Sequence, residues 1–403
     1  MRGEKAATNS DIIRELRGIC EVLLVGFVCL LFAFSAPAFF VPFLDPVVIR
    51  EFGWSREQAV LLASSKYLTG SIVAIVVGRF IDVIGVRLVL ITVSALGGFA
   101  LLSLLWTTGL TGYYLAGVML GFSGSGTMVA IKVLVSRTFH AAQGTAMGIA
   151  LLSTSLGAIM VPFAATWLMS VYGWRIGSAL LSAGVWFIAL PLMIFYLTEK
   201  TFDDRSAANG RNSVPATIDW SVVREFAASR TFWLIFLAVF CAGFVDQSLI
   251  QHQVLYLRED LALSAMVVAI VVSATGVIAF ITRPLVGSLF DRKSTRGVAF
   301  GYVVLGAACI IALGAANPFL LSVFVVFRAV GHSAVLLDTL VLAKHRFGLA
   351  HIGILIGVYT AAVNIGFAVG PPVVARLYML TGSYVVPFIA CAGVGLLAAA
   401  VLL

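Results

Sequence analysis

Twelve mainly apolar runs follow one another along this chain, and each is long enough to cross a bilayer as a helix, which takes about 20 residues. Backbone polar groups find no water inside a bilayer, so a spanning segment must pair them internally, as a helix does. The sequence therefore predicts an all-α membrane protein with twelve transmembrane helices. The predicted spans are 22–44, 56–80, 88–107, 111–136, 143–168, 175–197, 231–256, 264–290, 297–315, 318–343, 352–373 and 384–402.

The composition supports this fold class and excludes several others. Charged residues are only 11% of the 403 residues, and 61% are hydrophobic, whereas a soluble domain has about 25% charged residues. This argues against a soluble enzyme, a nucleic-acid-binding protein and a disordered protein. The sequence has no Walker, HExxH or CxxC motif and no pair of catalytic carboxylates. We therefore expect no enzyme, no metal site and no cofactor.

One long polar loop, 198–230, divides the chain nearly in half. We predict an N-terminal six-helix bundle over 1–197, which starts with a short cytosolic segment at 1–21, and a C-terminal bundle over 231–403. Lys and Arg gather on the cytosolic side of membrane proteins. With both termini in the cytosol, most of the 26 Lys and Arg residues fall in inner loops or at inner helix ends. The net charge of +8 therefore indicates topology, and we expect no nucleic-acid partner.

The two halves of the chain match each other at a constant offset of 209 residues. An offset without gaps across glycine, proline and charged positions indicates a duplicated six-helix unit. Two such units in parallel orientation are related by a pseudo-twofold axis along the membrane normal, with the binding site between them. The matching residues Gly78, Asp82, Arg87, Gly97, Gly148, Gly157, Pro162 and Gly173 recur as Gly287, Asp291, Arg296, Gly306, Gly357, Gly366, Pro371 and Gly382.

Two copies of one loop pattern follow the second and eighth spans. The first reads Gly78-Arg-Phe-Ile-Asp82-Val-Ile-Gly85-Val-Arg87, and the second reads Gly287-Ser-Leu-Phe-Asp291-Arg292-Lys-Ser-Thr-Arg296. The pattern resembles the inner-loop signature of the major facilitator superfamily, although Val83 stands where that family often has a basic residue. The resemblance implies that Asp82, Arg87, Asp291 and Arg292 form charge pairs that latch the outward-open state.

Further stretches resemble the monocarboxylate transporter family and its bacterial relatives, including the oxalate/formate-antiporter-like group. They read Glu-Phe-Gly-Trp-Ser-Arg at 51–56, Gly-Trp-Arg at 173–175, Arg-Pro-Leu-Val-Gly at 283–287 and Gly-Pro-Pro at 370–372. The resemblance covers nearly all twelve spans and implies that Arg283 binds a substrate carboxylate. The lysine that this family carries in its first helix is missing here, where Phe43 takes its place.

Ionisable groups inside a span cost several kcal/mol unless they are paired or hydrated, so each indicates a functional site. The guanidinium of Arg283 suits a carboxylate, which it can bind bidentately. We expect Asp338, at a similar depth in the tenth span, to hold Arg283 when the site is empty. The alternative is that Arg283 and Asp338 form a purely structural ion pair. Lys66, near the middle of the second span, is predicted to face the substrate and supply a second positive charge for an anion. The alternatives are that it is neutral or pairs with an acid.

Asp246 and His252 in the seventh span are the predicted carriers of a transported proton. Histidine titrates near neutrality, and a carboxylic acid in an apolar place can hold a proton. The alternatives are a salt bridge from Asp246 to Arg328 or Lys66, and a hydrogen-bonded histidine at a helix end. Arg328 and His332, four residues apart, share one face of the tenth span. We expect them to act in structure or gating, with Arg328 paired to Asp246.

Uncharged polar residues supplement these charges. Tyr67 in the second span and Tyr359 and Asn364 in the eleventh are predicted to donate hydrogen bonds to the substrate, and the alternative is that they link neighbouring helices. The eleventh span contains no lysine, although the resemblance to the oxalate carrier implies a second cation there. The absence favours a monoanion over a dicarboxylate.

Together these features predict a secondary active transporter for small monocarboxylates such as lactate or pyruvate. We expect proton-coupled symport by alternating access, with the proton as the coupling ion, in a monomer embedded in a bacterial inner membrane. The alternatives are exchange of organic anions without a proton, and export of drugs or other solutes. A transporter-like receptor is disfavoured, because only the loop 198–230 is long enough to carry a signal.

Overall fold

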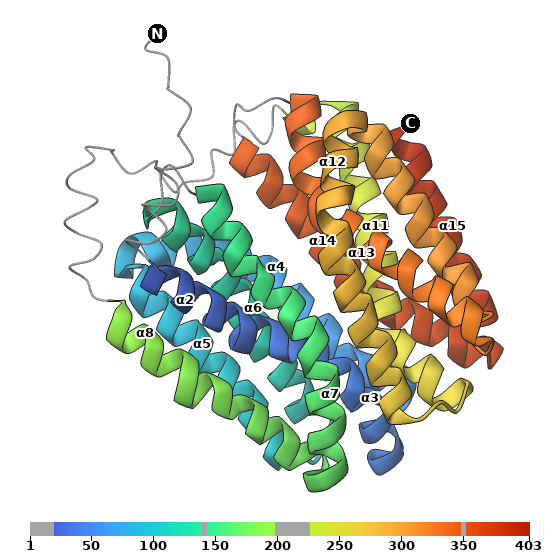
Figure 1. Ribbon diagram of the computed structural model, residues 1–403, viewed down its shortest axis with the longest axis horizontal. Helices are drawn as coiled ribbons and strands as arrows, with labels where there is room; N and C mark the ends of the chain where they lie inside the picture. Colours follow the sequence, from blue (N-terminus) through green and yellow to red (C-terminus); the bar gives the residue numbers. More distant parts are fainter. Residues whose placement is uncertain (1–19, 139–142, 198–225, 348–351) are drawn as a thin grey trace.

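The computed structural model describes residues 20–138, 143–197, 226–347 and 352–403, and within these ranges every regular element is a helix (Figure 1). The all-α fold class is therefore confirmed. Most of the predicted cytosolic segment 1–21 and most of the loop 198–230 lie outside the described residues.

The first half of the chain is built from α-helices that two π-helical segments extend. One of these segments, Leu30–Ser35, joins α2 and α3 into one continuous span, and the other, Gly184–Ala189, joins α7 and α8. The helices are α2 (Cys20–Cys29), α3 (Ala36–Phe52), α4 (Arg56–Ile84), α5 (Val86–Ser103), α6 (Leu110–Thr138), α7 (Gln143–Ala183) and α8 (Leu190–Tyr196).

The second half has fewer but longer helices. A π-helical segment, Tyr256–Asp260, extends the first of them at its outer end. The helices are α11 (Arg230–Leu255), α12 (Ala265–Ala312), α13 (Pro318–Phe347), α14 (Ile352–Thr381) and α15 (Val385–Leu402).

The described residues contain ten segments that are long and apolar enough to cross a membrane. One of them, Ala146–Tyr196, has 51 residues, more than twice the length of a single span. It bends at Gly173, whose φ of 77° and ψ of 165° are not helical, so it crosses twice. Helix α4 has 29 residues and is also long enough to cross. With these two additions the described helices are compatible with the twelve predicted crossings.

The first span is longer than the sequence predicted. The expected end was residue 44, but α3 continues to Phe52 through Pro42 and Pro46. Proline usually ends a helix because it has no N–H to donate. It is tolerated in membrane helices, where neighbouring groups satisfy the freed carbonyls. The longer helix places Asp45 inside the membrane span, and the sequence prediction did not include it there.

The two halves form bundles that lie side by side, with α2 to α8 in blue to green and α11 to α15 in yellow to red (Figure 1). Across the interface, α4 packs on α14 and α7 packs on α12. The end of the molecule that holds the C-terminus of α15 is cytosolic by the charge argument above. The opposite end, at the bottom of Figure 1, is here called the outer end.

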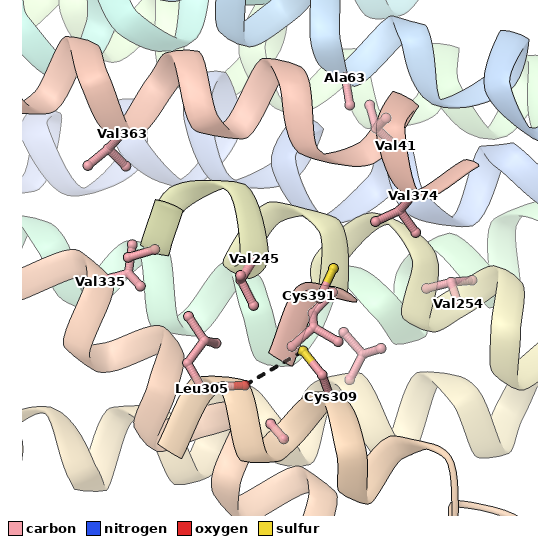
Figure 2. Packing of buried hydrophobic residues seen from close by; sticks show 14 of the residues in the cluster. Val41, Ala63, Val245, Val254, Leu305, Cys309, Val335, Val363, Val374 and Cys391 are labelled. Atoms are coloured by element: carbon pink, nitrogen blue, oxygen red, sulfur yellow. Dashed lines mark hydrogen bonds between the residues drawn. The ribbon is translucent and has the colours of Figure 1, made fainter. Parts of the chain in front are cut away.

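Small residues let the helices of the second half approach closely. A β-carbon added to Gly366 of α14 would lie 2.3 Å from the carbonyl oxygen of Phe240 in α11, so only glycine fits there. Figure 2 shows part of the apolar core, where Val245 of α11, Leu305 and Cys309 of α12 and Cys391 of α15 lie close together. The Sγ of Cys309 donates to the carbonyl oxygen of Leu305 at 3.7 Å.

We predict that Gly366→Ala destabilises the protein by about 1–3 kcal/mol, because the added methyl group forces α14 away from α11. The matched control is Gly393→Ala in α15, where an added β-carbon has nothing within 4 Å. Thermal unfolding of both variants in detergent checks this. The expected result is a lower midpoint for Gly366→Ala only, and equal midpoints would contradict the close contact.

Candidate functional site

A small cavity of about 30 Å³ lies between the two halves. Helices α3 and α7 line it from the first half, and α11, α12 and α13 line it from the second half. The lining is mainly apolar and includes five polar residues, Gln253, Thr275, Arg283, Arg328 and His332. This volume holds only one or two water molecules. A substrate would therefore need the halves to move apart before it could enter.

Arg283, on α12, lines this cavity and reaches across to the other half. Its guanidinium donates to the hydroxyl of Ser155 on α7 at 2.7 Å and contacts that of Thr154 at 3.4 Å. No carboxylate among the described side chains lies within ion-pair distance of it, and its Nε is buried without an acceptor. Arg283 is thus a half-buried cation whose described partners are neutral.

Arg328, on α13, is neutralised by Asp246 on α11. One terminal nitrogen of its guanidinium donates to Oδ1 of Asp246 at 2.6 Å, and the other donates to the backbone carbonyl of Asp246 at 3.3 Å. Both side chains are buried, with 2% and 0% of their surface exposed. Nδ1 of His332 lies 3.0 Å from Oδ2 of the same carboxylate. The pair expected from the sequence is present, and a role in gating stays a prediction.

Asp338 is not paired with Arg283 in this structure, contrary to the sequence prediction that it holds Arg283 when the site is empty. It accepts a hydrogen bond from the hydroxyl of Tyr302 on α12 at 2.6 Å. The reason is the turn of α13: ten residues separate Asp338 from Arg328, which places it roughly 80° around the helix. Arg328 and His332 therefore face Asp246 of α11, while Asp338 faces Tyr302 of α12.

His252 is buried inside the second half and is not among the residues that line the cavity. Its Nε2 lies 2.8 Å from the carbonyl oxygen of Pro371, so Nε2 carries the proton and donates. Its Nδ1 lies 2.9 Å from the hydroxyl of Tyr384, which donates when the imidazole is neutral. These contacts favour the structural alternative for His252, and its role in proton coupling stays a prediction.

Lys66 and Tyr67 lie on α4, which faces α14 of the other half. The Nζ of Lys66 is 4.9 Å from the centre of the Tyr67 ring, and no described carboxylate lies within ion-pair distance of it. Tyr67 packs edge-on against Phe367 of α14, with 5.0 Å between the ring centres, and hydrogen-bonds with Gln247. Both residues lie at the interface of the halves but outside the cavity lining.

Tyr359 and Asn364, the two candidates on α14, also lie outside the cavity lining. Tyr359 is fully buried and packs on Phe232 of α11, with 5.5 Å between the ring centres. Its hydroxyl has no partner within the described part of the chain. Contact of either residue with a substrate would require the halves to change their arrangement.

The inner-loop charges are only partly described. Arg87 donates to the carbonyl oxygen of Ile194 at 3.1 Å, which ties the start of α5 to the end of α8. Arg292 is exposed. The side chains of Asp82 and Asp291 lie outside the described residues, so the latch itself stays a prediction.

Three ion pairs join the halves among the residues that the structure describes, and all lie at the outer end. Arg50 of α3 pairs with Glu259, and Arg376 of α14 lies 3.8 Å from Glu57 of α4. Arg56 of α4 pairs with Asp260 at 2.9 Å. We call these pairs, with the contacts of Arg56 described next, the outer gate.

Arg56 links the outer gate to His252. Besides its pair with Asp260, it donates to the hydroxyl of Tyr384 at 3.0 Å. The same hydroxyl contacts His252, so one tyrosine touches both groups. Its guanidinium also lies 4.0 Å above the ring of Tyr378. The outer end is therefore closed in this structure by charge pairs and aromatic contacts.

Several residues of this region were missing from the sequence prediction, among them Asp45, Ser155, Gln251 and Gln253. Ser155 carried a detectable signal, because the offset of 209 residues aligns it with Asn364. Gln251 and Gln253 flank His252, but no rule distinguished which of the three faces the cavity. Asp45 was missed because the first span was expected to end before it.

Comparison with known families identifies the class of protein. The sequence profile of the Major Facilitator Superfamily matches residues 23–337 and 254–403. The chain therefore belongs to the Major Facilitator Superfamily and is an integral multi-pass membrane protein with a transporter fold. No curated protein sequence matches the chain.

Solved structures with the same fold belong to transporters named for different solutes. A mutant of the nucleoside transporter NupG has a TM-score of 0.77 and 13% identity, and the match covers 94% of this chain and 98% of that one. A mutant of the peptide transporter POT has a TM-score of 0.74 and 14% identity, with 94% and 93% covered. A bacterial homologue of the human lysosomal transporter Spinster, inward-facing and unoccupied, has a TM-score of 0.73 and 15% identity. This match covers 98% of this chain and 95% of that one. At these identities the likenesses show the fold alone.

We predict that Asp246→Asn destabilises the protein by about 3–5 kcal/mol, because it leaves the buried Arg328 without a counter-charge. The double variant Asp246→Asn/Arg328→Met is expected to lose less than the sum of the single losses. Thermal unfolding in detergent measures the two single variants, Asp246→Asn and Arg328→Met, and the double variant. The control, Glu51→Gln, removes a half-exposed pair with Arg175 and should cost at most about 1 kcal/mol. Additive losses at Asp246 and Arg328 would contradict the pairing.

Proposed function

We propose that this chain is a secondary active transporter that carries a small monocarboxylate of the lactate or pyruvate type together with a proton. The observation that carries the proposal is Arg283, a cation at the cavity whose described partners are the neutral hydroxyls of Ser155 and Thr154. A buried cation without a counter-charge is costly in a membrane. A carboxylate bound to the guanidinium, bidentately where geometry permits, supplies that charge.

The charge balance of the lining favours a monoanion. Arg328 is already neutralised by Asp246, so among the described lining residues one positive charge, that of Arg283, is left for a substrate. Gln253 also lines the cavity, and its Oε1 is buried with no donor among the described groups. This oxygen suits a substrate with a hydroxyl next to its carboxylate, because the unpaired acceptor would gain a hydrogen bond.

The position of Arg283 links binding to the movement of the halves. The residue lies on α12, while Ser155 and Thr154 lie on α7 of the other half. A carboxylate held between them contacts both halves, so it stabilises the state in which they close around it. Alternating access then follows when the outer gate opens and closes in turn with the inner side.

A proton on Asp246 would change this site in a way that supports symport. Protonation removes the negative charge that neutralises Arg328, whose guanidinium lines the same cavity as Arg283. Arg328 then becomes a second cation for the anion, so the proton and the substrate favour each other's binding. Carrying both together also avoids moving a net charge through the membrane interior. We place the protein as a monomer in a bacterial inner membrane.

Exchange of organic anions without a proton is the second candidate. The observation that favours it is that both predicted proton carriers already have partners: Asp246 holds Arg328 and His332, and His252 holds Tyr384 and the carbonyl of Pro371. If neither residue releases these partners during the cycle, Arg283 alone would bind the anions. It would bind one anion from one side of the membrane and then another from the opposite side.

Uptake of labelled L-lactate into proteoliposomes, with and without an inward proton gradient, separates the two candidates. Symport predicts accumulation driven by the gradient and abolished by a protonophore. Exchange predicts lactate counterflow that is independent of the gradient. If lactate does not move in either assay, the monocarboxylate proposal is wrong for lactate, and a panel of organic acids and apolar drugs follows.

We predict that Arg283→Ala lowers lactate uptake at least about thirtyfold, because losing one partner of a buried charge pair costs about 2 kcal/mol or more. The control is Arg230→Ala at the exposed inner end of α11, which should transport normally. Size-exclusion profiles of both variants check that they are folded. Normal uptake by a folded Arg283→Ala variant would remove the central residue of the proposal.

A further inference from the structure

Asp45 is a buried carboxylate with no described use in the site above. It lies on α3 between Pro42, which lines the cavity, and Arg50 of the outer gate, and 0% of its surface is exposed. No Lys, Arg or His among the described side chains lies within ion-pair distance of it. A charged carboxylate in such a place costs several kcal/mol, so the group is more stable when neutral.

The hydrogen bonds of Asp45 connect the two halves. Nε2 of Gln251, on α11 of the second half, donates to Oδ2 of Asp45. The hydroxyl of Tyr113, on α6 of the first half, lies 3.4 Å from Oδ1. Tyr113 donates this bond, and both partners of Asp45 are neutral. A protonated carboxyl group would keep the bond from Gln251 at its carbonyl oxygen and could donate its own O–H to the Tyr113 hydroxyl, which accepts as well as donates. Separating the halves would break the contact with Gln251.

We propose that Asp45 is a proton-binding site that holds the outer gate closed. When the halves meet at the outer end, its neutral carboxyl group is bonded to Gln251 and shielded from water. When they part, water can hydrate the charge, and the proton leaves to the outer solution. Proton binding therefore favours the closed gate. This inference rests on the alternating access of the proposed function and not on the identity of the substrate.

The backbone near Asp45 allows such a movement. Pro46 follows Asp45 directly and has no N–H, so the carbonyl of Pro42 lacks the usual donor four residues later. Helices bend preferentially at such positions. The outer part of α3, which carries Asp45 and Arg50, can therefore tilt relative to its inner part as the gate opens.

The other described ionisable groups on the helices that pack on α3 have contacts of their own, so none of them is left to pair with Asp45. His252 of α11 contacts Tyr384 and Pro371, and Asp246 of the same helix holds Arg328. The remaining contacts are Arg175 of α7 with Glu51, Glu57 of α4 with Arg376, Lys66 of α4 with the ring of Tyr67, and Tyr114 of α6 with the carbonyl of Gln58.

The test measures the outer gate without a substrate. Spin labels at Thr108→Cys and Ala316→Cys, exposed positions in the outer loops of the two halves, report their separation in lipid nanodiscs. The exposed Cys20 is replaced by Ser, and the other four cysteines are buried. In the otherwise native chain, raising the pH from about 5 to about 9 should increase the ratio of open to closed gate. One titrating proton limits the change to about tenfold per pH unit.

Asp45→Asn should abolish this pH response and keep the gate closed, because the amide is neutral at every pH. The control Glu51→Gln removes another carboxylate of α3, one whose partners Trp174 and Arg175 lie in the same half, and should keep the response. A pH response that persists in Asp45→Asn overturns the proposal. Its loss in His252→Gln instead would assign the switch to His252.

Gln251→Leu keeps the proposal testable if Asp45→Asn does not fold. It removes the bond across the halves but leaves the carboxyl group, so the open population should rise at every pH while a pH response remains. An unchanged population in this variant contradicts the proposal. The labels report on the gate whether or not lactate is transported, so failure of the lactate assay leaves this result intact.

Discussion

The central part of this protein depends on the cost of leaving a charge unpaired in a low-dielectric interior. Asp246 neutralises Arg328 and thereby joins α11 to α13, with His332 as a further contact. Arg283 meets the same constraint differently, through hydroxyl groups of the other half. The first arrangement stabilises one bundle. The second leaves a cation at the interface that an anion can neutralise, so stability and binding arise from the same physical requirement.

The two halves are duplicates in architecture but not in chemistry. At the offset of 209 residues, Arg283, Arg328, Asp246 and His252 align with Ala74, Met119, Pro37 and Phe43. The second half therefore carries the buried charges at these positions. The first half contributes apolar lining and the hydroxyls of Ser155 and Thr154. Such a division places the buried ion pair of Asp246 and Arg328 in one bundle, so the other bundle can move against it without breaking this pair.

The outer gate and Asp45 form two successive layers above the cavity. The ion pairs of Arg50 and Arg56 lie at the outer end, and the bond between Asp45 and Gln251 lies deeper on the same side of the cavity. Surface pairs of this kind contribute little individually, because water and salt screen them. A buried bond across the interface is not screened, which makes the deeper layer the better place for control by protons.

Length, hydropathy and the repeated loop pattern determined the helical class and the Major Facilitator fold, because the bilayer limits what an apolar chain can form. Charge counting likewise predicted the pair of Asp246 with Arg328. The tertiary structure decided the rest. Pro42 and Pro46 obscured the true length of α3, and hence Asp45, because neighbouring helices stabilise a segment that local rules end. The rotation of α13 decided that Asp338 meets Tyr302, and packing across the interface brought Ser155 to Arg283. Such contacts depend on how helices distant in sequence are oriented, which no single segment encodes.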